Sequence, residues 1–353
     1  METIVPLSFS VAEMQVAQAL AIERATLHSD EVLRDYCARP DTYGGRYVCA
    51  DTMKELLPGY AQSPVSRNAL HDAVHNSASV LAAEQFRRLV ERGPTSESNV
   101  AVFVTGVPGA GKTTAVRSVI AMNAAVVFEG QLRHPQAAFD KIDLAQKAGF
   151  EVHIMAVHVS PEVALDRTNA RFLSPHDGRG APMAYMAEIQ GNLPQRLEQI
   201  RKNFGGSVHL AVLDTNPSHE QLIEGWKTGI AHLEKAGQRD EISQRLHSAL
   251  DAGYREGRYS SEFYRQAAGY SPTAELGAAR RSTGDRGIHT DANRSEVSRG
   301  NAKEDALTPY VLGKLRGQEA GTEKTPVIAV VKPSPPDVQT PGKNAAEKPR
   351  LGR

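Results

Sequence analysis

One glycine-rich segment holds the residues whose types and spacing best suit chemistry. It reads Gly106-Val107-Pro108-Gly109-Ala110-Gly111-Lys112-Thr113, with Thr114 following, and it matches the phosphate-loop pattern G-x-x-x-x-G-K-[ST] at every fixed position. Its glycines let the backbone take positive φ and approach phosphates closely, so that successive N–H groups form an anion-binding nest. Lys112 suits the β- and γ-phosphates, and the Thr113 hydroxyl suits Mg²⁺. The segment predicts a nucleotide site for ATP or GTP with Mg²⁺.

The elements on either side must position this loop. Residues 99–105 are a continuous apolar run, which is typical of a strand buried on both faces, and a helical pattern follows over 111–122. A loop between such a strand and helix lies at the positive end of the helix dipole. The alternative interpretation is a glycine-rich strand–helix turn without a ligand.

The same strand–helix rhythm continues on both sides of the loop. Strands are expected at 46–50, ending at Asp51, and at 124–129, 151–159 and 209–213. Helices are expected at 69–92, near Pro135, from Pro161, in a segment broken at Pro194, and from a capping box at Ser218. This alternation predicts an α/β fold of the P-loop kinase kind, with a mainly parallel sheet of about five strands flanked by helices.

Composition divides the chain into four expected parts. Residues 1–46 form a helical segment with one amphipathic helix near 10–28, which either covers the nucleotide cleft or serves as ordinary core cover. Residues 47–236 form the kinase domain, and 237–271 form a helical extension. Residues 272–353 are rich in Gly, Ser, Thr, Arg and Pro, which favours a largely disordered tail.

Charge and hydropathy indicate the setting. Lys plus Arg and Asp plus Glu both number 41, so no overall field favours nucleic acid or an anionic membrane. No apolar run approaches the roughly 20 residues that span a bilayer. The two cysteines, Cys37 and Cys49, are too few for a disulfide framework. A cytoplasmic protein is therefore expected.

Several segments after the loop resemble the zeta-toxin family of kinases, over roughly 99–216. They are Glu129-Gly130-Gln131-Leu132-Arg133, Asn169-Ala170-Arg171-Phe172, Arg179-Gly180-Ala181-Pro182 and Asn192-Leu193-Pro194. In that family the strand with the catalytic aspartate follows the phosphate loop, but here about a dozen residues separate Thr114 from the next strand. The best match to the aspartate segment, Val48–Lys54 with Pro58 beyond, stands before the loop. We interpret this as a reordered kinase core; the alternative is an unrelated leader.

The resemblance implies phosphorylation of the sugar hydroxyl of a nucleotide sugar such as UDP-N-acetylglucosamine. It implies that Asp51 accepts the hydroxyl proton and that Arg171 and Arg179 act with Lys112 on the moving phosphoryl group. It places Glu84, Glu129 and Arg133 beside the acceptor and makes an antitoxin protein a partner. The histidines around the strands, His153 and His158 among them, are expected to be structural.

Two other functions stay open on the sequence. One is a P-loop kinase for another small molecule. The other is a catalytically lapsed nucleotide-binding effector whose tail docks a partner.

Overall fold

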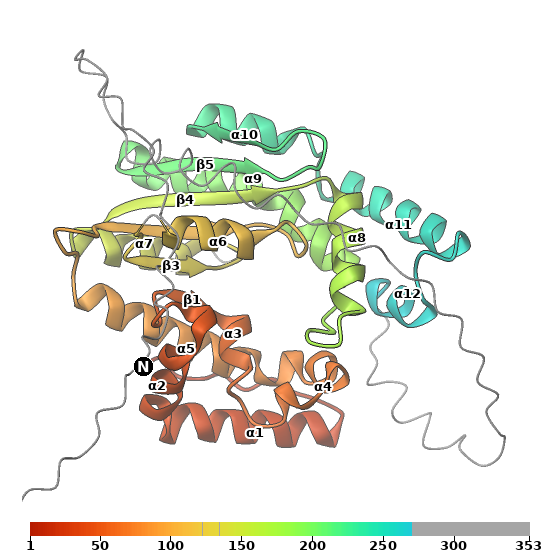
Figure 1. Ribbon diagram of the computed structural model, residues 1–353, viewed down its shortest axis with the longest axis horizontal. Helices are drawn as coiled ribbons and strands as arrows, with labels where there is room; N and C mark the ends of the chain where they lie inside the picture. Colours follow the sequence, from red (N-terminus) through yellow and green to blue (C-terminus); the bar gives the residue numbers. More distant parts are fainter. Residues whose placement is uncertain (122, 134, 270–353) are drawn as a thin grey trace, which may run out of the picture. The chain divides into compact units, whose positions relative to one another are not determined.

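The described residues fold around a six-stranded sheet. The computed structural model describes residues 1–269 except 122 and 134, so the expected tail at 272–353 lies outside the described residues. The strands are β1 (Tyr47–Cys49), β2 (Val100–Thr105), β3 (Val126–Glu129), β4 (Glu151–His158), β5 (Val208–Asp214) and β6 (Gln221–Glu224). Their spatial order is β1-β3-β2-β4-β5-β6 (Figure 1). The first five are parallel and β6 is antiparallel to β5, which confirms the mainly parallel sheet.

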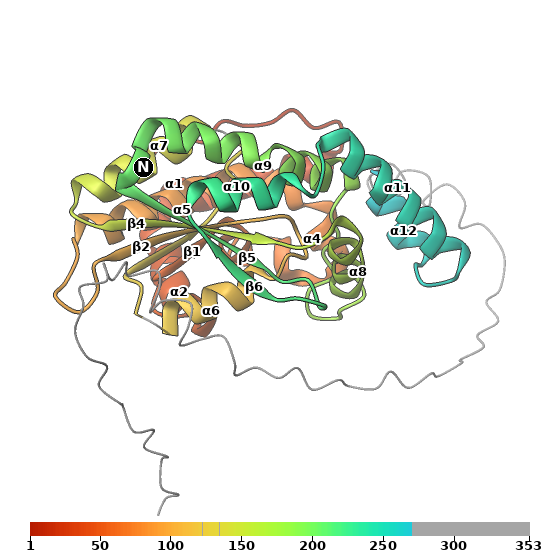
Figure 2. The same ribbon diagram turned by 90° about the horizontal axis from the view of Figure 1, so that it is seen from above.

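Alternating apolar residues of the strands create a core on each face of the sheet. Val100, Val102 and Val104 face one core, and Ala101 and Phe103 face the other, as a period of two requires. The first core is covered by α6 (Lys112–Ala121), α8 (Pro161–Phe172), α11 (Arg239–Arg255) and α12 (Ser261–Ala267). The second is covered by α5 (His71–Glu91), α7 (Pro135–Lys147) and α10 (Trp226–Glu234), and α9 (Met183–Phe204) contributes to both. Figure 2 shows α6 on one side of the sheet and α7, α9 and α10 on the other.

A third apolar cluster lies beside the β1 end of the sheet, where the red and orange helices gather in Figure 1. It joins α1 (Ala12–Leu27), α2 (Ser29–Ala38), α3 (Ala50–Lys54), α4 (Pro64–Ala69) and α5. The small residues Ala17, Ala21 and Ala25 allow α1 to approach α5 closely. The first segment therefore holds two helices, not one. The buried face of α1 packs on α5 and not on the glycine-rich loop. This supports the interpretation of α1 as core cover.

Three sequence predictions were wrong, each because tertiary packing overrode a local signal. The stretch after Ser218 forms β6, since Leu222 and Ile223 pair with the free edge of β5. Pro194 does not break its helix: α9 continues through it, because both halves of α9 are anchored in the sheet cores. Asp51 lies in the first turn of α3 and not at the end of a strand, because β1 stops at Cys49. No helix in the described part of the chain combines the length and hydropathy needed to cross a membrane.

An aromatic cluster packs α5 against the sheet, and a substitution in this cluster tests the contact. Phe86 of α5 is 1% exposed, and its ring centroid lies 5.7 Å from that of Phe103 and 5.3 Å from that of Phe128. Phe86→Ala should lower the free energy of unfolding by about 3–5 kcal/mol, through lost burial and a cavity. Urea unfolding followed by circular dichroism measures it. Val16→Ala, at an exposed position of α1, is the control and should change stability by less than about 0.5 kcal/mol. A small loss in Phe86→Ala would mean that α5 is not part of the sheet core.

Candidate active site

The glycine-rich loop connects β2 to α6 at the carboxyl edge of the sheet. Gly106, Gly109 and Gly111 have φ of 147°, 82° and 93°, a region that favours glycine. A Cβ on Gly106 would lie 2.3 Å from the Val157 carbonyl oxygen, and one on Gly109 would lie 2.4 Å from that of Ala164. The loop is therefore pressed against β4 and α8, and α6 begins at Lys112 with its N–H groups toward the loop.

Lys112 folds back over the loop. Its Nζ donates to the carbonyl oxygens of Gly106 at 3.0 Å and Val107 at 3.2 Å. The same ammonium lies 3.7 Å from Glu129 Oε1, while Glu129 Oε2 accepts a hydrogen bond of 2.7 Å from the Tyr47 hydroxyl. Residues from β1, the loop and β3 thus meet at one point.

Two residues that sequence reasoning missed support the loop from the other side. The Thr215 hydroxyl, just after β5, donates to the Ala110 carbonyl at 2.7 Å. Arg167 of α8 donates to the Thr215 carbonyl at 2.8 Å and to the Gly109 carbonyl at 3.4 Å. Arg167 stands four residues before Arg171 on the same helical face, and this spacing was the signal in the sequence.

Asp51 lies at the same edge, in a cluster of charged side chains. Lys54 Nζ, with its side chain fully buried, donates to Asp51 Oδ1 at 3.0 Å, and Arg179 Nη1 lies 3.6 Å from Oδ2. The Asp51 side chain is 43% exposed, so its carboxylate can be reached from outside. Burial by the surrounding atoms opposes ionisation, but Lys54 and Arg179 hold the pKa of the Asp51 carboxyl well below its usual range. Asp51 is therefore a carboxylate at physiological pH.

The ring of His71 completes this cluster, which we call the Asp51 cluster (Asp51, Lys54, His71 and Arg179). His71 Nε2 lies 2.9 Å from Lys54 Nζ. Burial and the Lys54 charge lower the pKa of His71 to about 3, so the imidazole is neutral at physiological pH. Nothing in the sequence pointed to His71, because it stands 17 positions after Lys54.

The two arginines expected at the phosphates lie on α8 and on the loop that follows it. Arg171 Nε donates to the Arg179 carbonyl at 3.0 Å, and Arg179 Nε donates to Asp177 Oδ1 at 2.6 Å. Arg179 therefore stands between Asp177 and Asp51, and Arg171 holds the backbone behind it. The structure brings both arginines to the Asp51 cluster.

The residues expected beside the acceptor separate into two groups. Arg133 Nη2 lies 2.9 Å from Glu188 Oε2, and its guanidinium stacks over the Tyr185 ring at 5.3 Å. Glu84 instead accepts hydrogen bonds of 2.7 Å from Arg87 and Arg88 of its own helix. The hydrogen bond from Arg87 is the largest cause that lowers the pKa of Glu84 to about 2. Glu84 lies 13 residues beyond His71 on α5, roughly 20 Å along the helix, so it is not part of this site.

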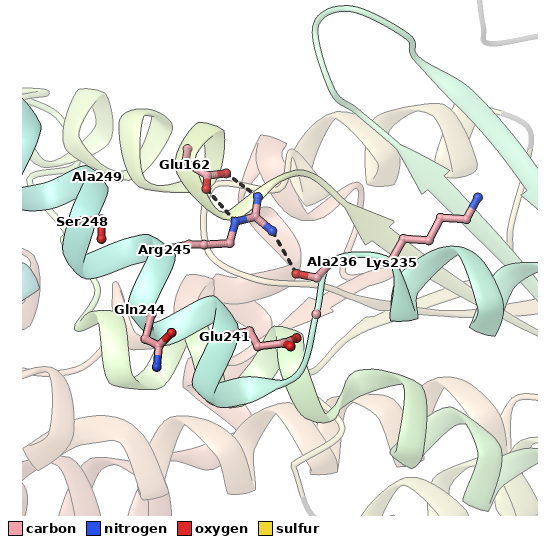
Figure 3. A pocket seen from close by; sticks show the side chains of 9 residues that line it. Glu162, Lys235, Ala236, Glu241, Gln244, Arg245, Ser248 and Ala249 are labelled. Atoms are coloured by element: carbon pink, nitrogen blue, oxygen red, sulfur yellow. Dashed lines mark hydrogen bonds and ion pairs between the residues drawn. The ribbon is translucent and has the colours of Figure 1, made fainter.

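Two hollows open on the described part of the chain. One includes Arg133, Pro182, Tyr185 and Glu188 in its lining. The other lies between α8, α10 and α11 and contains no residue of the glycine-rich loop; Figure 3 shows Arg245 inside it, bonded to Glu162 and to the Ala236 carbonyl.

The fold and the loop define the class of protein: an α/β P-loop protein with a kinase-like fold. Residues 114–222 match the family model described as zeta toxin, a match that begins directly after the Lys112–Thr113 pair. This segment of the chain is therefore similar to the zeta-toxin family. The match does not address the order of the segments before the loop.

Comparison with solved structures gives a similar chain from Streptococcus pneumoniae. It comes from a study titled as the molecular and structural characterisation of the PezAT chromosomal toxin-antitoxin system of that human pathogen. The two chains share 14% identity with a TM-score of 0.30, over 48% of this chain and 93% of the other. No curated protein matches the sequence.

The neutral His71 gives the fold a pH dependence. The unfolded chain binds a proton on this side chain near pH 6.5, whereas the folded chain does so only near pH 3. The contribution to stability is therefore complete above pH 6.5 and is lost as the pH falls toward 3; at pH 5 the loss reaches up to about 2 kcal/mol. Urea unfolding at pH 7, 6 and 5 should show a shallower fall for His71→Gln than for the wild type. The exposed control His247→Gln should follow the wild type, and equal slopes for His71→Gln would contradict the assignment.

Proposed function

We propose that this protein is an ATP- or GTP-dependent kinase that phosphorylates a sugar hydroxyl of a nucleotide sugar such as UDP-N-acetylglucosamine. One observation carries the proposal: the order β1-β3-β2 brings Asp51, which precedes the loop in sequence, to the same carboxyl edge as Lys112. Functional residues of a parallel sheet gather at this edge, whatever their order along the chain. The zeta-toxin match supports phosphoryl transfer as the reaction class.

In this proposal the donor phosphates lie in the nest of residues 106–114. The loop N–H groups and the start of α6 bind the β-phosphate, and Lys112 exchanges its carbonyl partners for phosphate oxygens. The Thr113 hydroxyl is exposed in the first turn of α6, where it would hold Mg²⁺. The ion would neutralise charge on the donor phosphates.

The acceptor in this proposal lies between Asp51 and the hollow beside Tyr185. Asp51 orients the acceptor hydroxyl and takes its proton as the new O–P bond forms and the bond from the γ-phosphorus to the bridging oxygen breaks, which releases the nucleoside diphosphate. The low pKa of Asp51 fits a base that acts late on an already positioned hydroxyl. Arg179 then turns one guanidinium edge from Asp51 to the moving phosphoryl group, with Arg171 beside it. Glu129 and Arg133 line the acceptor side.

The rest of the proposal follows from the family. We infer a cytoplasmic toxin whose activity is restrained by an antitoxin protein, with the kinase domain over 47–236 and α11 and α12 as its extension. A lapsed effector that binds nucleotide without turnover is the alternative. Incubating the full chain with labelled ATP or GTP and a panel of nucleotide sugars separates the two, since the effector would bind the nucleotide and label no sugar.

Lys112→Ala tests the nucleotide site. The variant should lose at least about 10²–10³-fold in phosphotransfer rate, because the developing charge on the γ-phosphoryl group loses its ammonium partner. Transfer of labelled phosphate to the sugar measures the loss. The exposed Lys147→Ala on α7 serves as the control and should keep the wild-type rate. Full activity in Lys112→Ala would refute the nucleotide site.

Asp51→Asn tests the reordered core. The variant should bind ATP like the wild type yet transfer phosphate about 10²–10⁴-fold more slowly, because an amide cannot accept the hydroxyl proton. Calorimetric ATP binding and the rate of sugar labelling give the two readouts. Asp72→Asn, an exposed carboxylate in the first turn of α5, is the matched control and should retain activity. Should Asp51→Asn keep the wild-type rate, another group is the base and the leader interpretation is favoured.

A further inference from the structure

Three elements bring together a second set of side chains with potential metal-ligating atoms, away from the Asp51 cluster. His158 ends β4, Asp214 ends β5, and His232 lies on α10. Their ligand atoms all lie within 4.8 Å of one another. His158 is 8% exposed, Asp214 is 1% exposed and the His232 side chain is 14% exposed, so the group is largely shielded from water.

The Asp214 carboxylate is oriented by its surroundings. Its Oδ1 accepts hydrogen bonds from the Asn216 backbone N–H at 2.9 Å and from Asn216 Nδ2 at 2.7 Å. This leaves Oδ2 directed at imidazoles: His232 Nε2 lies at 2.7 Å and His219 Nε2 at 3.9 Å. A carboxylate whose second oxygen is fixed by hydrogen bonds is the outer-shell arrangement typical of metal ligands.

We propose that His158, Asp214 and His232 bind a divalent transition-metal ion, Zn²⁺ by preference, with His219 as the fourth ligand. Three imidazoles and one carboxylate are ligands that suit tetrahedral Zn²⁺. Ligands about 2.0–2.1 Å from zinc stand roughly 3.4 Å apart, so the present group needs to contract by up to about 1.4 Å at its widest. His219 is 58% exposed on the loop between β5 and β6 and can complete the shell from the solvent side.

The local charges allow a cation here. The Asp214 carboxylate would offset one of the two positive charges of the ion. Arg245 is the arginine that acts electrostatically on His158, and its own charge is paired with Glu162, at 2.7 Å (Figure 3). The ion would also link β4, β5 and α10 directly beside Thr215, whose hydroxyl holds the Ala110 carbonyl of the loop. The site is thus a structural cross-link under the nucleotide loop.

A rival trio lies at the opposite end of the same two strands. Glu151, His153 and His209 also place ligand atoms within 4.8 Å of one another. His153 bonds Glu151 at 2.7 Å, and the two imidazoles stack at 4.7 Å. Because the two rings are stacked, the lone pairs of their nitrogens lie in nearly parallel planes and do not converge on one ion. This arrangement suits a hydrogen bond better than tetrahedral ligation of a metal. This trio provides a matched control.

The test is metal binding to the full chain after removal of bound ions with a chelator. Titration with Co²⁺ should give the visible absorption of tetrahedral cobalt at one ion per chain, and Zn²⁺ should displace it and raise the Tm. His158→Gln with His232→Gln should weaken Co²⁺ binding by at least tenfold and abolish the Tm rise, whereas His153→Gln with His209→Gln should keep both. These readouts do not involve phosphotransfer, so they stand apart from the proposed kinase activity.

A variant at the exposed fourth ligand covers the case in which the buried double variant fails to fold. His219→Gln leaves the buried trio intact and should shift the cobalt spectrum and lower the affinity. The proposal is overturned if the wild type shows no tetrahedral cobalt spectrum, if His219→Gln leaves spectrum and affinity unchanged, or if binding is lost only in the His153 and His209 double variant.

Discussion

The parallel pairing of β1 with β3 is the interaction on which the candidate site depends. In its register Cys49 stands opposite Glu129, and the Tyr47 hydroxyl bonds the Glu129 carboxylate across the same pair of strands. Because β3 also pairs with β2, this one ladder fixes the position of Asp51 along the strand direction relative to Lys112 at the edge of the sheet. Only three residues of β1 make the ladder, and all three are buried. Burial on both sides, by α5 on one and by the first core on the other, compensates for its shortness.

Charge organisation around Asp51 follows from this placement. A carboxylate at the start of a short helix gains from the backbone N–H groups there, and the buried Lys54 ammonium adds a direct partner. Such a buried ammonium needs an acceptor, and Asp51 with the neutral His71 ring provides it. Lys54 therefore ties the orientation of Asp51 to the packing of α5. Arg179 approaches from the opposite side on a loop, so its position depends on α8 and on Asp177 instead.

The sequence predicted much of this arrangement and missed the rest for identifiable reasons. The glycine-rich loop and the strand and helix beside it were predictable, because the backbone geometry of such a loop requires particular residue types at a fixed spacing. The expected strand before Asp51 is also part of the sheet, as the interpretation of a reordered core requires, and it lies at the edge beside β3. Pairings between distant residues were not predictable. His71 with Lys54, Thr215 with Ala110, and His158 with Asp214 and His232 each join elements whose contact is decided by the sheet order. The prediction that Glu84 lies beside the acceptor was wrong, because the resemblance identified its helix, α5, but not how far along the helix axis the site extends.

The strand order also affects how the chain is made. Tyr47 pairs with Val127, so β1 leaves the ribosome about 80 residues before its partner strand exists. Until then α1, α2 and α5 can bury their apolar faces only against one another, in the cluster around Ala21, Tyr36 and Leu81. A nascent chain that already carries Asp51, and even the glycine-rich loop, therefore has no β3 to align them. The candidate site therefore cannot assemble before Glu129 has emerged from the ribosome.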